Sequence, residues 1–319
     1  MKEKICTILV TFNREKLLKE CVLALQKQSK KPDCILVVNN SSTDGTLEML
    51  KEFNVQILNL NENTGSSGGF HNGIKWAFER KFDWVWLMDD DGLPVESTLQ
   101  KLLDAKENQS DGKIFNSLVR DKENPSKIAF GYNWKLNLFY KKEEVKFFEN
   151  VVDLKKVISD NILDGFPQFF NSSLIHRDAI KKIGYPIHNL FIRGDEVEYA
   201  FRAQKNGFKT YTVFDSIFYH PNPTIKKMNF WGLSFQYEPM QSWKHYYAMR
   251  NLIIIDRLYG DKFQIFIRIL KIIIKEFLIE VKSKEPLRAK FHKISTTLKA
   301  VFNGLRFPIN HSSPSQSLL

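Results

Sequence analysis

Cysteine and long apolar runs are both scarce in this 319-residue chain, and each shortage argues against a class of protein. The three cysteines, Cys6, Cys21 and Cys34, have neither the spacing of a metal site nor the pattern of a disulfide framework. We therefore expect a reducing, cytoplasmic compartment. The first apolar run ends at Thr11, so we expect a strand there rather than a signal peptide or a membrane span.

A glycine-rich segment at residues 61–73, NENTGSSGGFHNG, lacks two signatures of nucleotide binding. It has no Lys-Ser/Thr pair, which a P-loop requires, and it does not have the glycine spacing of a dinucleotide fingerprint. The segment still resembles a phosphate cradle. The simpler alternative is a flexible loop that glycine permits.

Positive charge is plentiful but unevenly placed along the chain. The net charge is +11, yet residues 241–319 carry 14 Lys and Arg against 5 Asp and Glu, a net charge of +9. Residues 1–240 are therefore close to neutral, at +2. A basic C-terminal region favours nucleic acid, anionic lipid or a phosphorylated ligand as its partner.

Residues 261–284 predict a long amphipathic helix within this basic region. Charged residues interrupt its apolar run too often for a membrane span, so the helix either lies in a membrane interface or packs on the protein or on a second subunit. The apolar side favours lipid over nucleic acid, and the charge asymmetry favours the membrane. The apolar side comprises Phe263, Ile267, Leu270, Ile274, Phe277 and Val281, and the basic stripe beside it comprises Arg268, Lys271, Lys275 and Lys282.

The first third of the chain alternates between apolar strands and helices. Strands are expected at Ile5–Asn13, Cys34–Ser42, Val55–Asn63 and 84–88, with a helical pattern after each of the first three. Later segments predict a hairpin pair within 127–148, a helix near Arg177, a helix that ends at Gly207, and a strand that ends at His220. Continuous apolar strands that alternate with helices are typical of an α/β fold with a mainly parallel sheet covered on both faces.

Polar clusters follow each of the first four predicted strands, at Thr11–Asn13, Asn39–Asp44, Asn61–Gly69 and Asp89–Asp91. In sheets of this kind, ligands bind beyond the carboxyl ends of the strands. The convergence of these clusters therefore predicts a binding site at that edge of the sheet.

Three consecutive carboxylates, Asp89, Asp90 and Asp91, follow the most apolar of these strands. An acidic turn is one explanation, because Asp, Gly and Pro favour turns. A divalent cation is the other, because it would offset the repulsion between adjacent like charges, and carboxylate oxygens suit Mg²⁺ or Mn²⁺. His220 also ends a predicted strand, where it would be either a structural residue or a ligand.

A second acidic pair, Asp195 and Glu196, opens a predicted helix. Acidic residues in a first turn complement the helix dipole, which is the structural explanation. The functional explanation is a general base that takes a proton from a sugar hydroxyl.

Taken together, these segments resemble the inverting glycosyltransferases of family 2, which have the GT-A fold. The resemblance extends from Lys4 to Asn251 and rests on TFNRE, NNSSTDGT, NENTGSSGGFHNG, MDDDGLP, GDEVEYAFRA, FYHP and SWKHYYAMRN. The triple aspartate and GDEVEYAFRA resemble galactofuranosyltransferases in particular. A glutamate holds the base position here, where aspartate is more usual, and this departure leaves Asp195 as an alternative to Glu196.

The resemblance implies a role for each motif. The cation, Mn²⁺ or Mg²⁺, would be held by Asp89, Asp91 and His220. The implied donor residues are Thr11, Asn13, Asn40, Asp44, Gly68, Gly69, Asn72, Asp89 and Asp90. The implied base is Glu196 or Asp195. Contacts with the acceptor or the diphosphate would come from His245, Tyr246, Tyr247 and Arg250, and from Trp134, Phe169 and Phe170 unless these three pack in the core.

The implied protein is a metal-dependent inverting glycosyltransferase at the inner face of the plasma membrane. It would transfer galactofuranose from UDP-galactofuranose to a glycan or lipid-linked glycan of a bacterial surface polysaccharide. A rhamnosyl- or other hexosyltransferase is the first alternative, and a non-catalytic protein that binds nucleotide sugars or anionic lipid is a distant one. We expect no nucleic-acid partner, and a homo-oligomer through the C-terminal helices is a further option.

The corresponding domains are a GT-A domain at residues 1–250, with a Rossmann-like donor half (1–112) and an acceptor half (113–250). A basic α-helical extension would follow at 251–306, and a disordered tail at 307–319.

Overall fold

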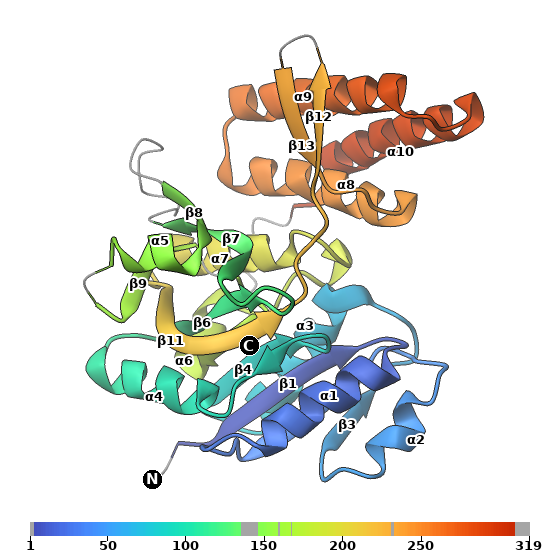
Figure 1. Ribbon diagram of the computed structural model, residues 1–319. Helices are drawn as coiled ribbons and strands as arrows, with labels where there is room; N and C mark the ends of the chain where they lie inside the picture. The colour runs from blue at the N-terminus through green and yellow to red at the C-terminus, as the bar shows by residue number, and fades with distance from the viewer. Residues whose placement is uncertain (1–2, 135–145, 159, 167, 231–232, 310–319) are drawn as a thin grey trace. The chain divides into compact units, whose positions relative to one another are not determined.

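The computed structural model describes residues 3–134, 146–158, 160–166, 168–230 and 233–309 (Figure 1). The chain divides into two compact units. Among the described residues, the first comprises those within 3–189 and 196–222, and the second comprises those within 190–195 and 223–309. The predicted domain boundary after residue 250 falls inside a helix, Ser242–Tyr259, whereas the contacts of the chain divide it at Pro223.

The first unit is built on one large sheet. Its strand order is β3-β2-β1-β4-β10-β6-β11-β9-β7-β8, and β5 pairs with β11 outside this path. The pairs β1–β2, β2–β3, β1–β4 and β6–β11 are parallel, and β10 runs antiparallel to both of its neighbours. The strands are β1 Ile5–Thr11, β2 Cys34–Asn39, β3 Gln56–Asn59, β4 Trp84–Asp89, β5 Leu93–Pro94, β6 Ile114–Asp121, β7 Lys127–Trp134, β8 Lys146–Asn150, β9 Ile162–Phe166, β10 Asn171–His176 and β11 Tyr211–His220.

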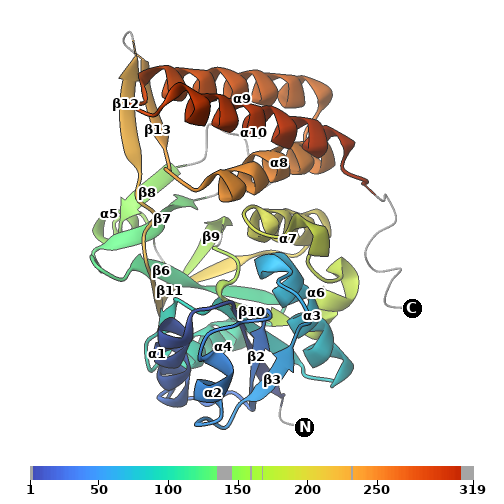
Figure 2. The ribbon, with the colours of Figure 1, turned by 90° about the vertical axis from the view of Figure 1, so that its right-hand side faces the viewer.

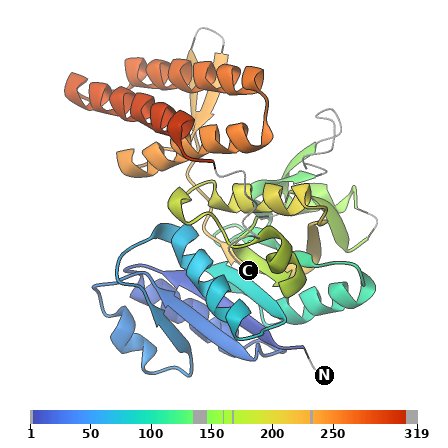
Figure 3. The ribbon, with the colours of Figure 1, turned by 180° about the vertical axis from the view of Figure 1, so that it is seen from behind.

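Helices cover both faces of this sheet, as Figures 2 and 3 show. They are α1 Glu15–Gln26, α2 Thr46–Leu50, α3 Gly65–Glu79, α4 Thr98–Asn108, α5 Val151–Lys155, α6 Arg177–Ile183 and α7 Asp195–Lys205, with a short 3₁₀ turn at His188–Leu190. The predicted α/β fold with its mainly parallel sheet is therefore confirmed, and each predicted strand and helix of this unit has a counterpart.

Alternation along the strands divides the interior into two apolar cores. In β1, Ile8 and Val10 face the core formed with α3, α6 and α7, whereas Ile5 and Leu9 face the core formed with α1, α2 and α4. Because successive side chains of a strand point to opposite faces, a strand buried on both faces must be apolar throughout. This explains the uninterrupted apolar runs seen in the sequence.

The glycine-rich segment is helical from Gly65 onward. Residues 61–64 precede α3, residues 65–73 form its N-terminal part, and Gly69 and Gly73 face the sheet. A Cβ atom on Gly69 would lie 2.3 Å from Val10 Cγ1, and one on Gly73 would lie 2.6 Å from Ile8 Cγ2. Close approach of the helix to β1 therefore explains these two glycines, and the flexible-loop alternative is incorrect.

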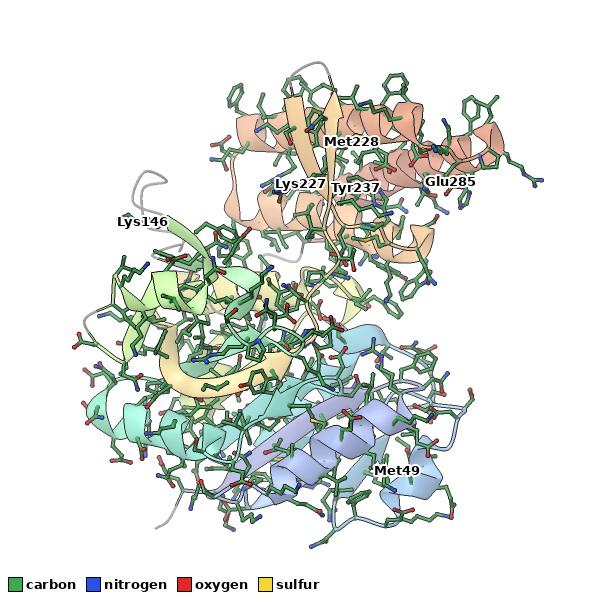
Figure 4. The ribbon with its side chains drawn as sticks, viewed as in Figure 1. Met49, Lys146, Lys227, Met228, Tyr237 and Glu285 are labelled. Atoms are coloured by element: carbon green, nitrogen blue, oxygen red, sulfur yellow. The ribbon has the colours of Figure 1, made fainter. Side chains whose placement is uncertain are left out.

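The second unit contains a hairpin and three helices. Their bounds are β12 Lys226–Phe230, β13 Leu233–Tyr237, α8 Ser242–Tyr259, α9 Lys262–Lys282 and α10 Leu287–Arg306. Figure 4 labels Lys227, Met228 and Tyr237 on the hairpin. Asp261 and Gln264 form a capping box that fixes the start of α9. Ile253, Ile272 and Val301 form a small core among the three helices.

Two predictions concern the end of the chain. The C-terminal α-helical extension is confirmed by α8, α9 and α10. In the part of the chain that the structure describes, no helix has both the length and the apolar character needed to cross a membrane. Most of the predicted disordered tail, residues 310–319, lies outside the described residues.

Candidate active site

Asp89, Asp91 and His220 meet at the carboxyl ends of β4 and β11. One ligand atom from each residue lies within 4.8 Å of the others. β4 and β11 are not neighbours in the sheet, but β5 follows the acidic turn directly and pairs with β11, so that Leu93 lies opposite Tyr219. This pairing carries the turn after β4 to the end of β11 and thereby brings the aspartates to His220.

Arg14 and Thr11 bind the same acidic turn from the end of β1. The Arg14 guanidinium lies 2.7 Å from Asp91 Oδ2 and 3.0 Å from Asp90 Oδ1, while the Thr11 hydroxyl donates to Asp90 Oδ2 at 2.7 Å. His220 Nε2 lies 3.0 Å from Asp91 Oδ1. Two of the three carboxylates, Asp90 and Asp91, are thus held together by one guanidinium, one hydroxyl and one imidazole.

Burial and neighbouring charges give the three carboxyl groups different pKa values. Burial and the neighbouring charge of Asp91 raise the pKa of Asp89 to about 8, and burial raises the pKa of Asp90 to about 6. Burial also disfavours ionised Asp91, but the His220 and Arg14 cations hold its pKa well below the usual range. Burial opposes the charged form of His220, yet Asp91 raises the pKa of this imidazole overall. Asp89 therefore keeps its proton at neutral pH unless a further positive charge, such as that of a cation, offsets its negative charge.

The donor set fits a divalent cation in two further respects. Asp91 Oδ1 is buried and accepts no well-aligned hydrogen bond from the described residues, although His220 Nε2 lies close to it. The other ring nitrogen of His220, Nδ1, lies 2.7 Å from the carbonyl oxygen of Pro221, which orients the imidazole as second contacts do at metal sites. Two carboxylates and one imidazole are ligands that Mn²⁺ accepts, and the carboxylates also suit Mg²⁺.

The predicted donor residues after β2 organise the loops around the site. Asn40 is buried, and its amide donates to Gly65 O at 2.7 Å while its oxygen accepts from Thr64 N at 3.0 Å. Asp44 accepts hydrogen bonds from the backbone and hydroxyl of Thr46. Asn40 and Asp44 therefore fix the entries of α3 and α2, and the donor contacts implied for their side chains stay predictions.

Asn13 and Asn72 also bond within the protein. Asn13 adopts a positive φ of 53°, and its side-chain oxygen accepts from Thr43 N at 2.7 Å. Asn72 donates to Gly68 O at 2.8 Å inside α3. Gly68 and Gly69 are buried in the same helix. The structure gives each of these residues a structural role, and their role toward a donor remains a prediction.

The two candidate bases begin α7. Asp195 is 1% exposed, whereas Glu196 is partly exposed, so Glu196 is the more accessible carboxylate. Glu198, further along the helix, is buried in an ion pair with Arg202 at 2.6 Å. Of the acidic side chains in this helix, Glu198 is therefore structural.

The backbone just before α7 is strained and tied to α8. Phe191 and Arg193 have positive φ angles of 67° and 66°. The Asn251 amide nitrogen lies 2.7–3.0 Å from the carbonyl oxygens of Leu190, Ile192 and Arg193. Arg250 also donates to Leu190 O at 2.9 Å. Because non-glycine residues rarely adopt positive φ without support, these bonds hold the turn that precedes the candidate bases.

Arg193 adds a second anchor to this turn. Its guanidinium contacts both carboxylate oxygens of Glu238, at 2.6 and 3.1 Å. We expect Arg250 to face the diphosphate or the acceptor, and its guanidinium donates to Leu190 O at 2.9 Å and to Asn251 Oδ1 at 3.0 Å. This contact gives Arg250 a positioning role at Leu190, and its role toward the diphosphate or the acceptor remains a prediction.

The remaining predicted acceptor residues of α8 also pack within the second unit. His245 Nε2 lies 2.9 Å from Thr297 Oγ1 and 3.5 Å from Glu276 Oε2. Asn303 donates to the Tyr246 hydroxyl at 2.7 Å. Tyr247 stacks on Phe191, with ring centroids 4.6 Å apart. These contacts account for the three side chains without a ligand, and their role toward an acceptor remains a prediction.

Two predicted sugar-stacking rings lie in the core instead. Phe169 is 1% exposed and Phe170 is 3% exposed, and Phe170 stacks on Phe70 with ring centroids 4.2 Å apart. A ring that is buried in this way has no face for a sugar, so the core-packing alternative holds for both residues. Trp134 belongs to β7, and its side chain lies outside the described residues.

Sequence reasoning missed Arg14 and Asn251 as individual residues. Arg14 was visible only as the basic residue after the β1 cluster, and Asn251 only as the last residue of SWKHYYAMRN. Neither has a spacing that reveals its partner, since Arg14 and Asp91 are 77 residues apart. Their roles come from tertiary contacts.

This chain is similar to a family model, to curated sequence relatives and to solved structures. The family model described as "Glycosyl transferase family 2" matches residues 6–163. Galactofuranosyltransferase GlfT1 of Mycolicibacterium smegmatis is 29% identical over 258 residues, which cover 78% of this chain and 82% of the relative. A beta-1,3-glucosyltransferase of Campylobacter jejuni, named for its GalNAc(5)-diNAcBac-PP-undecaprenol acceptor, is 25% identical over 224 residues, which cover 65% of this chain and 71% of that relative.

Among solved structures, S. aureus TarS 1–349 in complex with UDP has a TM-score of 0.51 and 16% identity, covering 99% of this chain and 78% of that chain. A longer TarS structure is matched over 97% of this chain but only 46% of its own length. At this identity the likeness shows the fold alone. Glycosyltransferase names among the sequence relatives favour an enzyme over a binding module. The chain carries a glycosyl transferase family 2 match over residues 6–163 and is a glycosyltransferase.

Proposed function

We propose that this glycosyltransferase is metal-dependent and inverting, and that it transfers galactofuranose from UDP-galactofuranose. The observation that carries the proposal is the meeting of Asp89, Asp91 and His220 at the carboxyl ends of β4 and β11. The GlfT1 relative supports the choice of galactofuranose, and the UDP in the TarS structure supports a uridine nucleotide.

Asp89, Asp91 and His220 would hold Mn²⁺ or Mg²⁺. Such a cation, when bound, neutralises charge on a diphosphate leaving group. Arg14 and Thr11 keep the acidic turn in place through Asp90 and Asp91. The proposed donor residues are Thr11, Asn13, Asn40, Asp44, Gly68, Gly69, Asn72, Asp89 and Asp90, the asparagines and Asp44 acting through the loops that they fix.

The proposed chemistry is a single displacement. Glu196, or Asp195 as the alternative, takes the proton of the acceptor hydroxyl. The acceptor oxygen forms a bond to the anomeric carbon from the face opposite the diphosphate, and the bond from that carbon to the diphosphate oxygen breaks. UDP leaves with the electron pair, so the anomeric configuration is inverted. The partial exposure of Glu196 favours it over the buried Asp195 as the group that an acceptor reaches.

A different hexose is the second candidate donor sugar. The Campylobacter relative is named as a glucosyltransferase, and this favours a glucosyl- or another hexosyltransferase over the rhamnosyl alternative. Its name also supports a lipid-linked glycan as acceptor. We therefore place the proposed enzyme at the inner face of the plasma membrane, in assembly of a bacterial surface polysaccharide, with peripheral membrane contact through its C-terminal helices.

The first test is calorimetric binding of UDP and a panel of UDP-sugars to the full chain, with Mn²⁺ or with chelator. We expect UDP binding that requires the cation and weakens about 100-fold or more in Asp91→Ala. Asp153→Ala, an exposed carboxylate of α5, is the matched control and should bind as the wild type does. If no nucleotide binds under either condition, the proposal is overturned. Turnover of each UDP-sugar then identifies the donor.

A further inference from the structure

The amphipathicity of α9 is inverted. The residues that it buries are Ile272, Glu276 and Glu280, two of which are carboxylates. Six large apolar side chains of the same helix are 40–72% exposed: Phe263, Phe266, Leu270, Ile274, Phe277 and Val281. A surface helix of a globular protein normally turns its apolar stripe inward and its charges outward.

Polar contacts inside the second unit hold α9 in this orientation. Lys293 of α10 lies 3.3 Å from Glu280, and His245 of α8 lies 3.5 Å from Glu276. On the hairpin side, Lys275 donates to Gln236 O at 2.6 Å. A cavity of about 650 Å³ within the unit is lined by several of these residues, namely His245, Lys275, Glu276, Glu280 and Lys293. Turning the apolar side inward would break the Lys293–Glu280 ion pair and the contact between His245 and Glu276.

α10 carries a second exposed apolar stripe. It comprises Leu287, Phe291, Leu298, Phe302 and Leu305, which are 42–73% exposed. The two stripes together are called the outer apolar face here. α10 packs on α8 through Thr297 and Gly304, which lie on another side of the helix. Figure 4 shows side chains standing out from α9 on the side away from α8.

Positive charge borders the outer apolar face. Arg288, Lys299 and Arg306 are exposed and follow one another along one side of α10, beside its apolar stripe. The Arg306 guanidinium lies 4.1 Å from the ring centre of Phe302. Between residues 262 and 309 the acidic residues are Glu276, Glu280 and Glu285, and Glu276 and Glu280 point inward. The exposed surface of the two helices is therefore apolar and cationic.

We propose that the outer apolar face docks on an anionic lipid bilayer, with α9 and α10 lying in the interface. This deepens the membrane contact of the proposed function by assigning it to particular side chains. Bilayers offer what this surface requires, since acyl chains accept the rings and leucines while anionic head groups pair with the arginines and the lysine. A second copy of the chain is less suitable, because a symmetric contact would bring two like-charged rows together.

The test is flotation of the full chain with vesicles of equal parts phosphatidylglycerol and phosphatidylcholine, without any donor sugar. We expect the wild type to bind these vesicles and to bind pure phosphatidylcholine much more weakly. Phe277→Ser with Phe291→Ser should reduce partitioning about tenfold or more, because two exposed rings leave the interface. Arg288→Gln with Lys299→Gln and Arg306→Gln should reduce it mainly at low salt.

Val152→Ser in α5 is the matched control, since Val152 is 61% exposed but lies in the first unit. Because the substituted residues are exposed, thermal unfolding should be unchanged in every variant. Equal partitioning of wild type and the double phenylalanine variant overturns the proposal. So does a wild-type dimer in light scattering that the same variant converts to a monomer without any vesicle binding. Nucleotide binding is measured separately, so failure of the transferase proposal leaves this result interpretable.

Discussion

The two units of this chain distribute apolar and charged residues in opposite ways. In the first unit, Leu18, Leu25 and Leu102 of α1 and α4 are fully buried against the sheet. In the second unit, α9 buries two glutamates and exposes three phenylalanines. The first arrangement is that of a domain in water. The second arrangement is expected of a helix whose exposed apolar side contacts a lipid bilayer, as we propose for α9. Four predictions test this contrast.

The largest expected difference is between two partly buried histidines, His220 of the first unit and His245 of the second. His220→Ala removes a proposed cation ligand, so we expect activity to fall about 100-fold or more. His245→Ala removes only a partner of Thr297 and Glu276, so activity on a soluble acceptor should stay within about threefold of wild type. Steady-state turnover with added Mn²⁺ measures both. A loss in His245→Ala as large as that in His220→Ala would support its predicted role at the acceptor or the diphosphate.

A pair of leucines tests burial directly. Leu102 of α4 is 0% exposed and Leu298 of α10 is 47% exposed. Leu102→Ala should lower the free energy of unfolding by about 2–5 kcal/mol, since it leaves a cavity. Leu298→Ala should change it by less than about 1 kcal/mol. Urea unfolding followed by circular dichroism makes the comparison, and similar losses in both variants would contradict the exposed position of Leu298.

The turn at residues 190–194, which precedes the candidate bases, is expected to affect activity rather than stability. Asn251→Ala removes the amide that donates to the carbonyl groups of Leu190, Ile192 and Arg193, so the strained turn should relax. We expect kcat to fall about tenfold with the KM for the donor unchanged, because the bases are displaced rather than removed. The control is Asn303→Ala, which loses a hydrogen bond to Tyr246 in the same unit. An equal fall in kcat for both variants would point to general loosening of the helices.

The smallest effect concerns the inward carboxylate of α9. Burial, together with the charge of Glu280, raises the pKa of Glu276 from 4.5 to about 7. The folded state therefore holds a proton that the unfolded state releases, and stability should fall as the pH rises from about 5 to about 8. Burial lowers the pKa of His245, so its contribution to stability rises with pH below about 6.5. His245 is present in all three proteins compared below, so this contribution does not distinguish them.

Glu276→Gln should abolish the Glu276 contribution and melt at a higher temperature than wild type at pH 8. Glu285→Gln, an exposed carboxylate at the turn between α9 and α10, is the control and should follow the wild-type curve. Thermal unfolding across this pH range measures all three proteins. Parallel curves for wild type and Glu276→Gln would show that Glu276 is ionised throughout.

The sequence predicted the first unit well because its signals are local. Uninterrupted apolar strands identified the sheet, and the residues after each strand identified the edge where Asp89 and Asp91 lie. The glycine-rich segment was harder, since glycine suggests a loop unless the helix can be seen to approach Val10 and Ile8. Its helical state depends on a tertiary contact that no local pattern contains.

The second unit was predicted less completely. Periodicity identified the apolar stripe of α9, but it cannot say which stripe faces inward, because that depends on Lys293 and His245 from the neighbouring helices. The stripe of α10 was not recognised, and Phe169 and Phe170 proved to be core residues. Pairings such as Arg14 with Asp91 likewise join residues that are distant in the chain.

The contact between Gly69 and Val10 should limit which residues evolution can place at these two positions. The two residues share one small space between α3 and β1, so a larger residue at either position requires a smaller one at the other. Among natural relatives, positions 10 and 69 should therefore change together rather than separately. Anyone who transplants α3 into another scaffold will need to move the matching strand position with it.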